Sequence, residues 1–222
     1  MFELFDPEAD FQVSVGSNLP HWFQPGVTYF VTFRTHDSLP ADVSKRWYAE
    51  RVRWLAQRGI RSSDRTWRAQ LARLTRAERT RFHRQFSQRF MENLDKGWGA
   101  CVLRRPKLAA IVADSLWHFD GDRYDLSDFV VMPNHVHILV GLRGTTEIVA
   151  QCNSWKRFTA LKLNQAMRTT GRFWSEESFD HLVRSPAQFE AIRRYIAANP
   201  PSAKLTPGEF ILYQRPRTSP IK

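Results

Sequence analysis

Two histidines, His135 and His137, lie one residue apart in the apolar, β-branched stretch 129–140. Successive side chains of a β-strand point to opposite faces, so these imidazoles share a face, about 6–7 Å apart at Cα. Two imidazoles on one face can bind a divalent metal if another ligand comes from elsewhere in the fold. Two strand histidines that are hydrogen-bonded to their neighbours are the plainer interpretation, and the spacing alone favours it.

The residues around the pair predict how this strand is built. Val136, Ile138 and Val140 point away from the histidines, as the core-facing side of a strand does. Pro133 and Asn134 interrupt the apolar run immediately before the pair and favour a tight turn. We therefore expect residues 124–132 and the histidine strand to pair as a hairpin.

The order of elements along the chain predicts an α+β fold. Residues 27–34 are β-branched and aromatic throughout and form the clearest first strand. Further elements are expected as helices at 41–58, 75–94, 106–119, 144–168 and 187–199, and as a last strand at 178–184. This order best fits a ferredoxin-like antiparallel sheet with helices, plus an Arg-rich helical insertion at about 41–96 after the first strand.

Three parts of the chain differ in composition. Residues 1–26 contain prolines and glycine with little periodicity and predict an extended leader. Residues 27–200 form the expected domain, and Pro200 and Pro201 are expected to stop its final helix. Residues 201–222 are basic and Pro-rich and predict an extended tail.

The net charge favours a polyanionic partner. Thirty-three Lys and Arg against 22 Asp and Glu give a formal charge of +11, which points to nucleic acid before membrane. Many arginines lie in the insertion, where the solvated face of amphipathic helices explains most of them. Their excess over acids still makes this region a candidate clamp for backbone phosphates.

Cysteine and apolar patterning predict the compartment. Cys101 and Cys152 are far apart and in no metal-like spacing, so no disulfide framework is indicated, which suits a reducing cytoplasm. The acidic N-terminus is not a secretory signal, and no apolar run approaches the roughly 20 residues of a membrane span. We expect a cytoplasmic protein without a membrane partner.

A tyrosine on the final helix could complete the histidine site. Tyr195 and Asn199 are four residues apart and share a helical face. A helical Tyr beside Ile196 is more often part of a core than catalytic. Here, however, an amide oxygen one turn away could complete a two-histidine metal site, and Arg193 and Arg194 lie beside the tyrosine.

Four ordered blocks together resemble a known family. They are YFVTFR at 29–34, VMPNHVH at 131–137, FDHLVR at 179–184 and YIAANP at 195–200. The chain resembles the single-tyrosine HUH transposases (IS200-like) from about residue 27 to 200, and the REP-associated tyrosine transposase branch most closely. Two positions depart from the family pattern: Pro201 replaces an apolar residue, and Trp174-Ser175-Glu176 replaces a Trp-Gln pair.

The resemblance implies roles for particular residues. His135 and His137 would bind Mg²⁺ or Mn²⁺, Asn199 would lie close to that metal, and Tyr195 would be the nucleophile. The implied activity is that of a metal-dependent single-stranded DNA endonuclease and strand transferase, which forms a 5′-phosphotyrosine intermediate on hairpin-containing DNA. A monomer or a homodimer is compatible with this activity.

Further residues are candidates for supporting roles. Asp180 and His181 fall in a matched block and could orient the site, although a plain structural role fits them equally well. Candidate DNA contacts are the basic and aromatic residues Arg34, Trp155, Lys156, Arg157, Arg193 and Arg194.

Two other functions compete with this one. A non-catalytic protein that binds DNA or RNA hairpins could have kept the same fold, although retention of His135, His137 and Tyr195 argues against it. A zinc hydrolase could use the same histidines, but the sequence offers no acidic third ligand and no His-Glu-x-x-His pattern.

Overall fold

The computed structural model describes residues 2–15, 20–64 and 66–216. Five strands form one antiparallel sheet in the order β6-β3-β5-β4-β7. The strands are β3 (Thr28–Thr35), β4 (Tyr124–Val131), β5 (His135–Leu142), β6 (Trp174–Leu182) and β7 (Ile211–Gln214). The expected α+β fold with an antiparallel sheet is confirmed, and so is the hairpin of β4 and β5 around Pro133 and Asn134.

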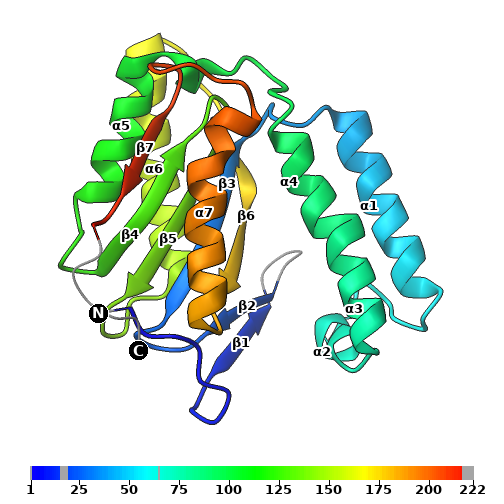
Figure 1. The fold of residues 1–222 in the computed structure, drawn as a ribbon. Coiled ribbons are helices and arrows are strands. Elements are labelled where there is room, and N and C mark those ends of the chain that lie inside the picture. The colour runs from blue at the N-terminus through cyan, green and yellow to red at the C-terminus, as the bar shows by residue number, and fades with distance from the viewer. Residues whose placement is uncertain (1, 16–19, 65, 217–222) are drawn as a thin grey trace.

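Helices cover both faces of this sheet (Figure 1). Helices α5 (Pro106–Trp117) and α6 (Ile148–Met167) cover one face, and α7 (Pro186–Ser202) lies on the other. Val136, Ile138 and Val140 point into the larger core under α5 and α6, as the alternation predicts. Leu139 packs on the opposite face against Phe189 and Ile196 of α7. The histidines of β5 alternate with the core-facing set and therefore face the α7 side.

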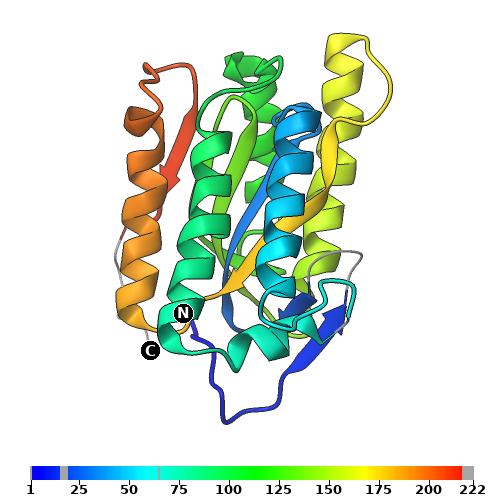
Figure 2. The same cartoon turned by 90° about the vertical axis from the view of Figure 1, so that its right-hand side faces the viewer.

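The helical insertion follows β3 and stands beyond the β6 edge of the sheet in Figure 1, and Figure 2 shows its last helix next to α7. It consists of α1 (Ala41–Ala56), α2 (Trp67–Ala72), α3 (Arg76–Phe82), the π-helical turn η1 (His83–Gln88) and α4 (Arg89–Leu94). A separate cluster that includes Trp54, Leu55, Phe82 and Phe86 holds these helices together. The second expected helix is therefore interrupted by a π turn, and the sequence pattern missed α2. A 3₁₀ turn, η2 (Val102–Arg104), leads into α5.

The helix α7 continues through Pro200 and Pro201, whereas the sequence predicts that these prolines stop it. A proline holds φ near −65°, which is a helical value, and costs the helix one N–H donor. Both prolines lie in the last turn, so few intrahelical hydrogen bonds are lost. The turn closes with the N–H of Ala203 donating to the carbonyl of Asn199 at 3.1 Å.

Both ends of the chain are more structured than the composition predicts. In the leader, β1 (Gln12–Val15) pairs with β2 (Pro20–Phe23). In the tail, β7 pairs with β4 and so adds the fifth strand to the sheet. A lone four-residue strand carries little signal in the sequence, because its stability comes from the edge on which it pairs. Residues 217–222 of the expected tail lie outside the described residues.

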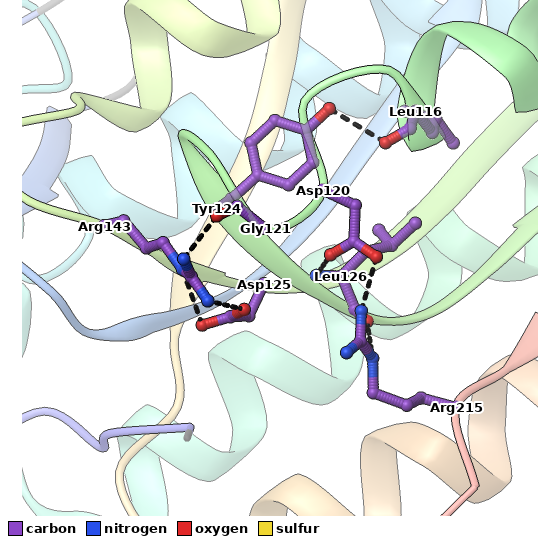
Figure 3. A network of polar contacts seen from close by, with 8 residues as sticks. All are labelled: Leu116, Asp120, Gly121, Tyr124, Asp125, Leu126, Arg143 and Arg215. Carbon is purple, nitrogen blue, oxygen red and sulfur yellow. Dashed lines mark hydrogen bonds and ion pairs between the residues drawn. The ribbon is translucent and has the colours of Figure 1, made fainter.

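A polar network anchors the segment after β7 (Figure 3). The guanidinium of Arg215 donates to the carbonyl of Leu126 at 2.6 Å and forms an ion pair with Asp120. The second carboxylate oxygen of Asp120 accepts from the N–H of Leu126 at 2.7 Å. These contacts fix the C-terminal segment to the start of β4. Of the helices in the described residues, none is both long and apolar enough to cross a bilayer.

Candidate metal centre

The two histidines of β5 lie together under α7 and the end of the insertion. Both side chains are completely buried, and their ring centroids are 4.6 Å apart. In the sheet, His137 pairs with Thr32 and His135 pairs with Arg34 of β3. The shared face that the spacing predicts is therefore present.

A carboxylate joins the histidines, and sequence reasoning missed it. Asp95 directly follows α4, and its Oδ1 lies 3.6 Å from Nε2 of His135. One ligand atom from each of Asp95, His135 and His137 lies within 4.8 Å of the other two. The statement that no acidic third ligand is present is therefore wrong, because a residue 40 positions before His135 supplies it. No motif marks Asp95, so sequence spacing alone could not identify it.

Several polar atoms at this place lack hydrogen-bond partners among the described residues. They are Nε2 of His135, Oδ1 of Asp95, and both side-chain atoms Nδ2 and Oδ1 of Asn199, all fully buried. Buried polar groups are normally partnered, and each unsatisfied group costs about 1–3 kcal/mol. Imidazole nitrogen, carboxylate oxygen and amide oxygen from three separate elements make a donor set that fits a divalent cation.

Asn134 determines which nitrogen of His135 carries the proton. Its Nδ2 donates to the carbonyl oxygens of Trp98 at 2.9 Å and Leu94 at 3.3 Å. The amide oxygen of Asn134 therefore faces Nδ1 of His135, 2.7 Å away, and can only accept. His135 is thus protonated on Nδ1, which leaves the lone pair of Nε2 pointing toward Asp95.

Thr32 gives His137 a corresponding partner. Its Oγ1 lies 2.7 Å from Nδ1 of His137. When Nδ1–H donates to this hydroxyl, the lone pair of Nε2 faces the site. Histidines that bind metals usually donate their other ring N–H in this way, which fixes the ring orientation.

Burial sets the protonation states of the three groups. Desolvation lowers the pKa of His135 to about 3 and lowers the pKa of His137 well below its usual value. Desolvation also raises the pKa of Asp95 to about 6, with a further contribution from the charge of Glu92. Both imidazoles are therefore neutral at pH 7, which is the form that binds a metal.

Tyr195 reaches this cluster from α7. Its hydroxyl oxygen lies 3.4 Å from Nε2 of His137, and its ring packs edge-on against Phe30. Burial raises the pKa of Tyr195 above its usual value of 10, and the charge of Asp95 raises it further. The phenol is therefore protonated at neutral pH.

Asn199 lies one helical turn beyond Tyr195. Its carboxamide is close enough to raise the pKa of His135 and to lower that of Tyr195, against the larger effects of burial. It makes no hydrogen bond of normal geometry with a described residue. The helix thus brings an amide and a phenol to the same end of the histidine cluster.

Asp180 and His181 do not join this cluster. Asp180 pairs with Val31 and so lies on the other face of the sheet, where its charge raises the pKa of the Cys152 thiol after the larger effect of burial. His181 shares the face of His137, but its Nε2 lies 2.5 Å from the amide nitrogen of Gln188. The structure therefore corrects the expectation that Asp180 supports the site.

Three of the candidate DNA contacts have their polar groups engaged within the fold. Trp155 is 2% exposed and donates to the hydroxyl of Tyr124 at 3.0 Å. Lys156 is also buried and donates to the carbonyl oxygens of Ser175 and Glu176.

The partly buried Arg193 forms an ion pair with the fully buried Asp128 at 2.9 Å. For Trp155, Lys156 and Arg193 the expectation of a DNA contact is thus corrected, because their polar groups are engaged within the fold. Arg157 and Arg194 are exposed, and the half-buried Arg34 donates to Ser38 at 3.1 Å. These three stay predictions.

Comparison with known proteins agrees with the sequence resemblance. Residues 116–199 match the family model described as "Transposase IS200 like", a segment that includes His135, His137, Tyr195 and Asn199. Asp95 lies outside this segment. No curated protein sequence matches the chain.

The chain is also similar to two solved structures, at low sequence identity. One is a REP-associated tyrosine transposase bound to a REP hairpin, with 13% identity, coverage of 86% of this chain and 76% of that chain, and a TM-score of 0.45. The other is a putative transposase from Deinococcus radiodurans R1, with 14% identity, coverage of 80% and 93%, and a TM-score of 0.31. Both TM-scores are below 0.5, and neither likeness carries a function over to this chain.

Proposed function

We propose that this chain, which carries an IS200-like transposase segment at residues 116–199, is a metal-dependent single-stranded DNA endonuclease and strand transferase. The observation that carries this proposal is the position of the Tyr195 hydroxyl. It lies 3.4 Å from a buried imidazole of the His135, His137 and Asp95 cluster. A nucleophile and a cation site are thereby within reach of the same phosphate group.

The ligands proposed for the cation are Nε2 of His135, Nε2 of His137 and the carboxylate of Asp95, with the amide oxygen of Asn199 as a further donor. A divalent ion held there supplies a Lewis acid for a non-bridging oxygen of the scissile phosphate. Two imidazoles are unusual ligands for Mg²⁺, which prefers oxygen, so Mn²⁺ is the better assay ion.

Tyr195 carries the covalent step. Its hydroxyl oxygen attacks phosphorus, the bond from phosphorus to the 3′-oxygen of the preceding nucleotide breaks, and that oxygen leaves as a 3′-hydroxyl. The phenolic proton is lost during attack and the leaving oxygen gains one, so the step needs no other reactant. Because burial raises the pKa of Tyr195, attack has to be coupled to loss of this proton.

The product is a 5′-phosphotyrosine bond between Tyr195 and the downstream strand. This bond keeps the energy of the phosphodiester, so a second 3′-hydroxyl can attack it and join strands without ATP. A hairpin next to the cleaved position is the proposed substrate, on the strength of the family resemblance. Strand transfer therefore uses the same atoms as cleavage, in reverse.

The ligand set also bears on the competing functions. Two histidines and an aspartate suit zinc as well as manganese, so the discovery of Asp95 removes one argument against a zinc hydrolase. A hydrolase would release both DNA fragments free, and a binding protein would release neither. Only the proposed function leaves one fragment covalently on the protein.

The test uses a DNA hairpin with single-stranded extensions, labelled in parallel at its 3′ or its 5′ end. With Mn²⁺ present, the 3′ label is expected on the protein after SDS and heat, and the 5′ label on a shorter free strand. Tyr195→Phe should bind DNA and lose the adduct. His135→Ala combined with His137→Ala should lose cleavage. Adduct formation by Tyr195→Phe at the parent rate, or release of both labels as free DNA, would contradict the proposal.

A further inference from the structure

The helical insertion carries a basic pocket outside the metal cluster. Arg81, Arg84, Gln85, Arg89 and Glu92 line an open cavity of about 450 Å³ on the surface of α3, η1 and α4. Three guanidinium groups and one carboxylate leave the lining with a net positive charge. The pocket has the size of sites that bind small ligands, and it suits one or two nucleotides of a single strand better than a duplex.

The π turn explains why these residues share one surface. In an unbroken α-helix with 3.6 residues per turn, every fourth residue drifts by about 40° around the axis. Phe82 and Phe86 are four residues apart and both pack against Trp54, and Phe86 and Phe90 both pack against Trp47. The wider turn η1 absorbs the drift, so the aromatic residues stay on the side of α1.

The same wide turn brings Arg89 onto the helix face that carries Arg81 and Gln85, and these residues form the arginine row of the pocket. The extra residue places position 89 where position 88 would lie in an α-helix, on the face of Arg81 and Gln85. Such π turns inside helices are frequently found at functional sites. The insertion therefore keeps its aromatic core and its arginine row on two separate faces.

The pocket arginines differ from other arginines of the insertion. Arg51 lies over the rings of Trp47 and Trp67, and Arg58 bonds to Glu78 and stacks on Trp54. Those guanidinium groups stabilise the helical cluster. By contrast, Arg81, Arg84 and Arg89 form no ion pair with any carboxylate in the described part of the chain. Their charge is available to a ligand.

The row leads toward the metal cluster. Glu92 lines the pocket from the last turn of α4, three residues before Asp95. The charge of Glu92 raises the pKa of both Asp95 and Tyr195. At a rise of about 1.5 Å per residue, the eleven steps from Arg81 to Glu92 cover about 16 Å. This length accommodates a few phosphates of one strand, because successive phosphates rise by about 3.4 Å along the axis of B-DNA and lie farther apart when the strand is extended.

We infer that Arg81, Arg84 and Arg89 bind successive phosphates of a single DNA strand and lead it to Tyr195. The inference rests on the proposed function, because it concerns the strand whose phosphate Tyr195 attacks. The ligand is the phosphodiester backbone, so the pocket contributes affinity and register without reading base sequence. The insertion then contributes both a metal ligand, Asp95, and the path of the strand.

The test compares two triple variants with the same loss of charge. One is Arg81→Gln, Arg84→Gln and Arg89→Gln. The matched control is Arg61→Gln, Arg73→Gln and Arg105→Gln, at exposed positions outside the pocket. Affinity for a fluorescent hairpin with single-stranded extensions is measured from low to high salt, and again with the same hairpin made blunt.

The pocket variant should lower the slope of log affinity against log salt by about 2, since each single-strand phosphate contact contributes about 0.7. The control variant should lower this slope by less than 1. On the blunt hairpin the two variants should give equal slopes. Replacing the same three arginines by Lys keeps the charges and should restore most of the slope. Equal slopes for the two Gln variants on the extended hairpin would overturn the inference.

The wild-type protein separates this inference from the function on which it rests. If the wild type forms the covalent adduct and the pocket variant behaves like its control, only the strand path is wrong. If the wild type neither binds the extended hairpin nor forms an adduct, the proposed function and this inference fail together. Thermal unfolding of each variant checks that these exposed substitutions leave the fold intact.

Discussion

The side-chain oxygen of Asn134 lies 2.7 Å from Nδ1 of His135, while the amide nitrogen of Asn134 donates to the carbonyl oxygens of Leu94 and Trp98. These carbonyls lie on either side of Asp95 in the chain. One buried amide therefore fixes the tautomer of a histidine and also holds the segment that brings the carboxylate to it. The β4–β5 turn and the end of the insertion are joined at the metal cluster.

Asn134→Asp is expected to weaken Mn²⁺ binding by about 10- to 100-fold, the usual loss when the partner of a ligand is altered. The new carboxylate can still accept from His135, but it cannot donate to Leu94 and Trp98. Isothermal titration with Mn²⁺ measures the loss, and ¹⁵N NMR of the imidazoles reports the tautomer of His135. The exposed Asn153→Asp is the matched control. Unchanged Mn²⁺ affinity would show that Asn134 does not position the site.

Asp95→Asn should have opposite effects on stability and on metal binding. The raised pKa of Asp95, about 6 against 3.8, means that its ionised form is destabilised by burial at pH 7.5. Asn removes that charge, so the free energy of unfolding of the metal-free protein, measured with urea, should rise by roughly 1–3 kcal/mol. Mn²⁺ affinity should fall at least tenfold. Asp114→Asn, at an exposed position on α5, should change neither quantity, and a metal-free protein destabilised by Asp95→Asn would contradict the assigned burial cost.

The affinity for Mn²⁺ should depend on pH through Asp95. Its carboxyl must lose a proton to bind the ion, and a pKa of about 6 means that this proton is bound below pH 6 and lost above it. Affinity should therefore fall about tenfold between pH 7 and pH 5. Both histidines are already neutral throughout this range, because their pKa values are lowered.

The affinity of the wild-type protein for Mn²⁺ should be constant above pH 7. The Asp95→Asn variant should bind Mn²⁺ weakly, and its affinity should show no change between pH 5 and pH 7. A wild-type affinity that keeps rising tenfold per unit between pH 7 and pH 8.5 would mean that another proton controls binding.

Asp128→Asn should destabilise the fold by up to about 3–5 kcal/mol, because it leaves the partly buried guanidinium of Arg193 without its counter-charge. The pair joins α7, which carries Tyr195, to β4, and Gln214 of β7 also donates to Asp128 at 3.0 Å. Urea unfolding measures the loss. Asp42→Asn, at the exposed pair with Arg46, should cost less than about 0.5 kcal/mol. Similar losses for the two variants would argue against a structural role for the buried pair.

Local spacing in the sequence was sufficient for pairs within one element. The two-residue period of a strand predicts that His135 and His137 share a face, and the four-residue spacing on a helix predicts the same for Tyr195 and Asn199. Alternation also predicts that Val136, Ile138 and Val140 point into the core. These relations depend only on backbone geometry, so no knowledge of the fold was needed.

Contacts between distant segments were decided by the tertiary structure alone. Asp95 reaches His135 because the end of the insertion returns to the histidines of β5, where Asn134 holds it. Arg193 and Trp155 looked like nucleic-acid contacts in the sequence, yet each bonds to a distant partner in the interior. The residue types set which groups can bind a metal or attack a phosphate. Which of them meet depends on how the layers pack, because burial and long-range hydrogen bonds are properties of the whole fold.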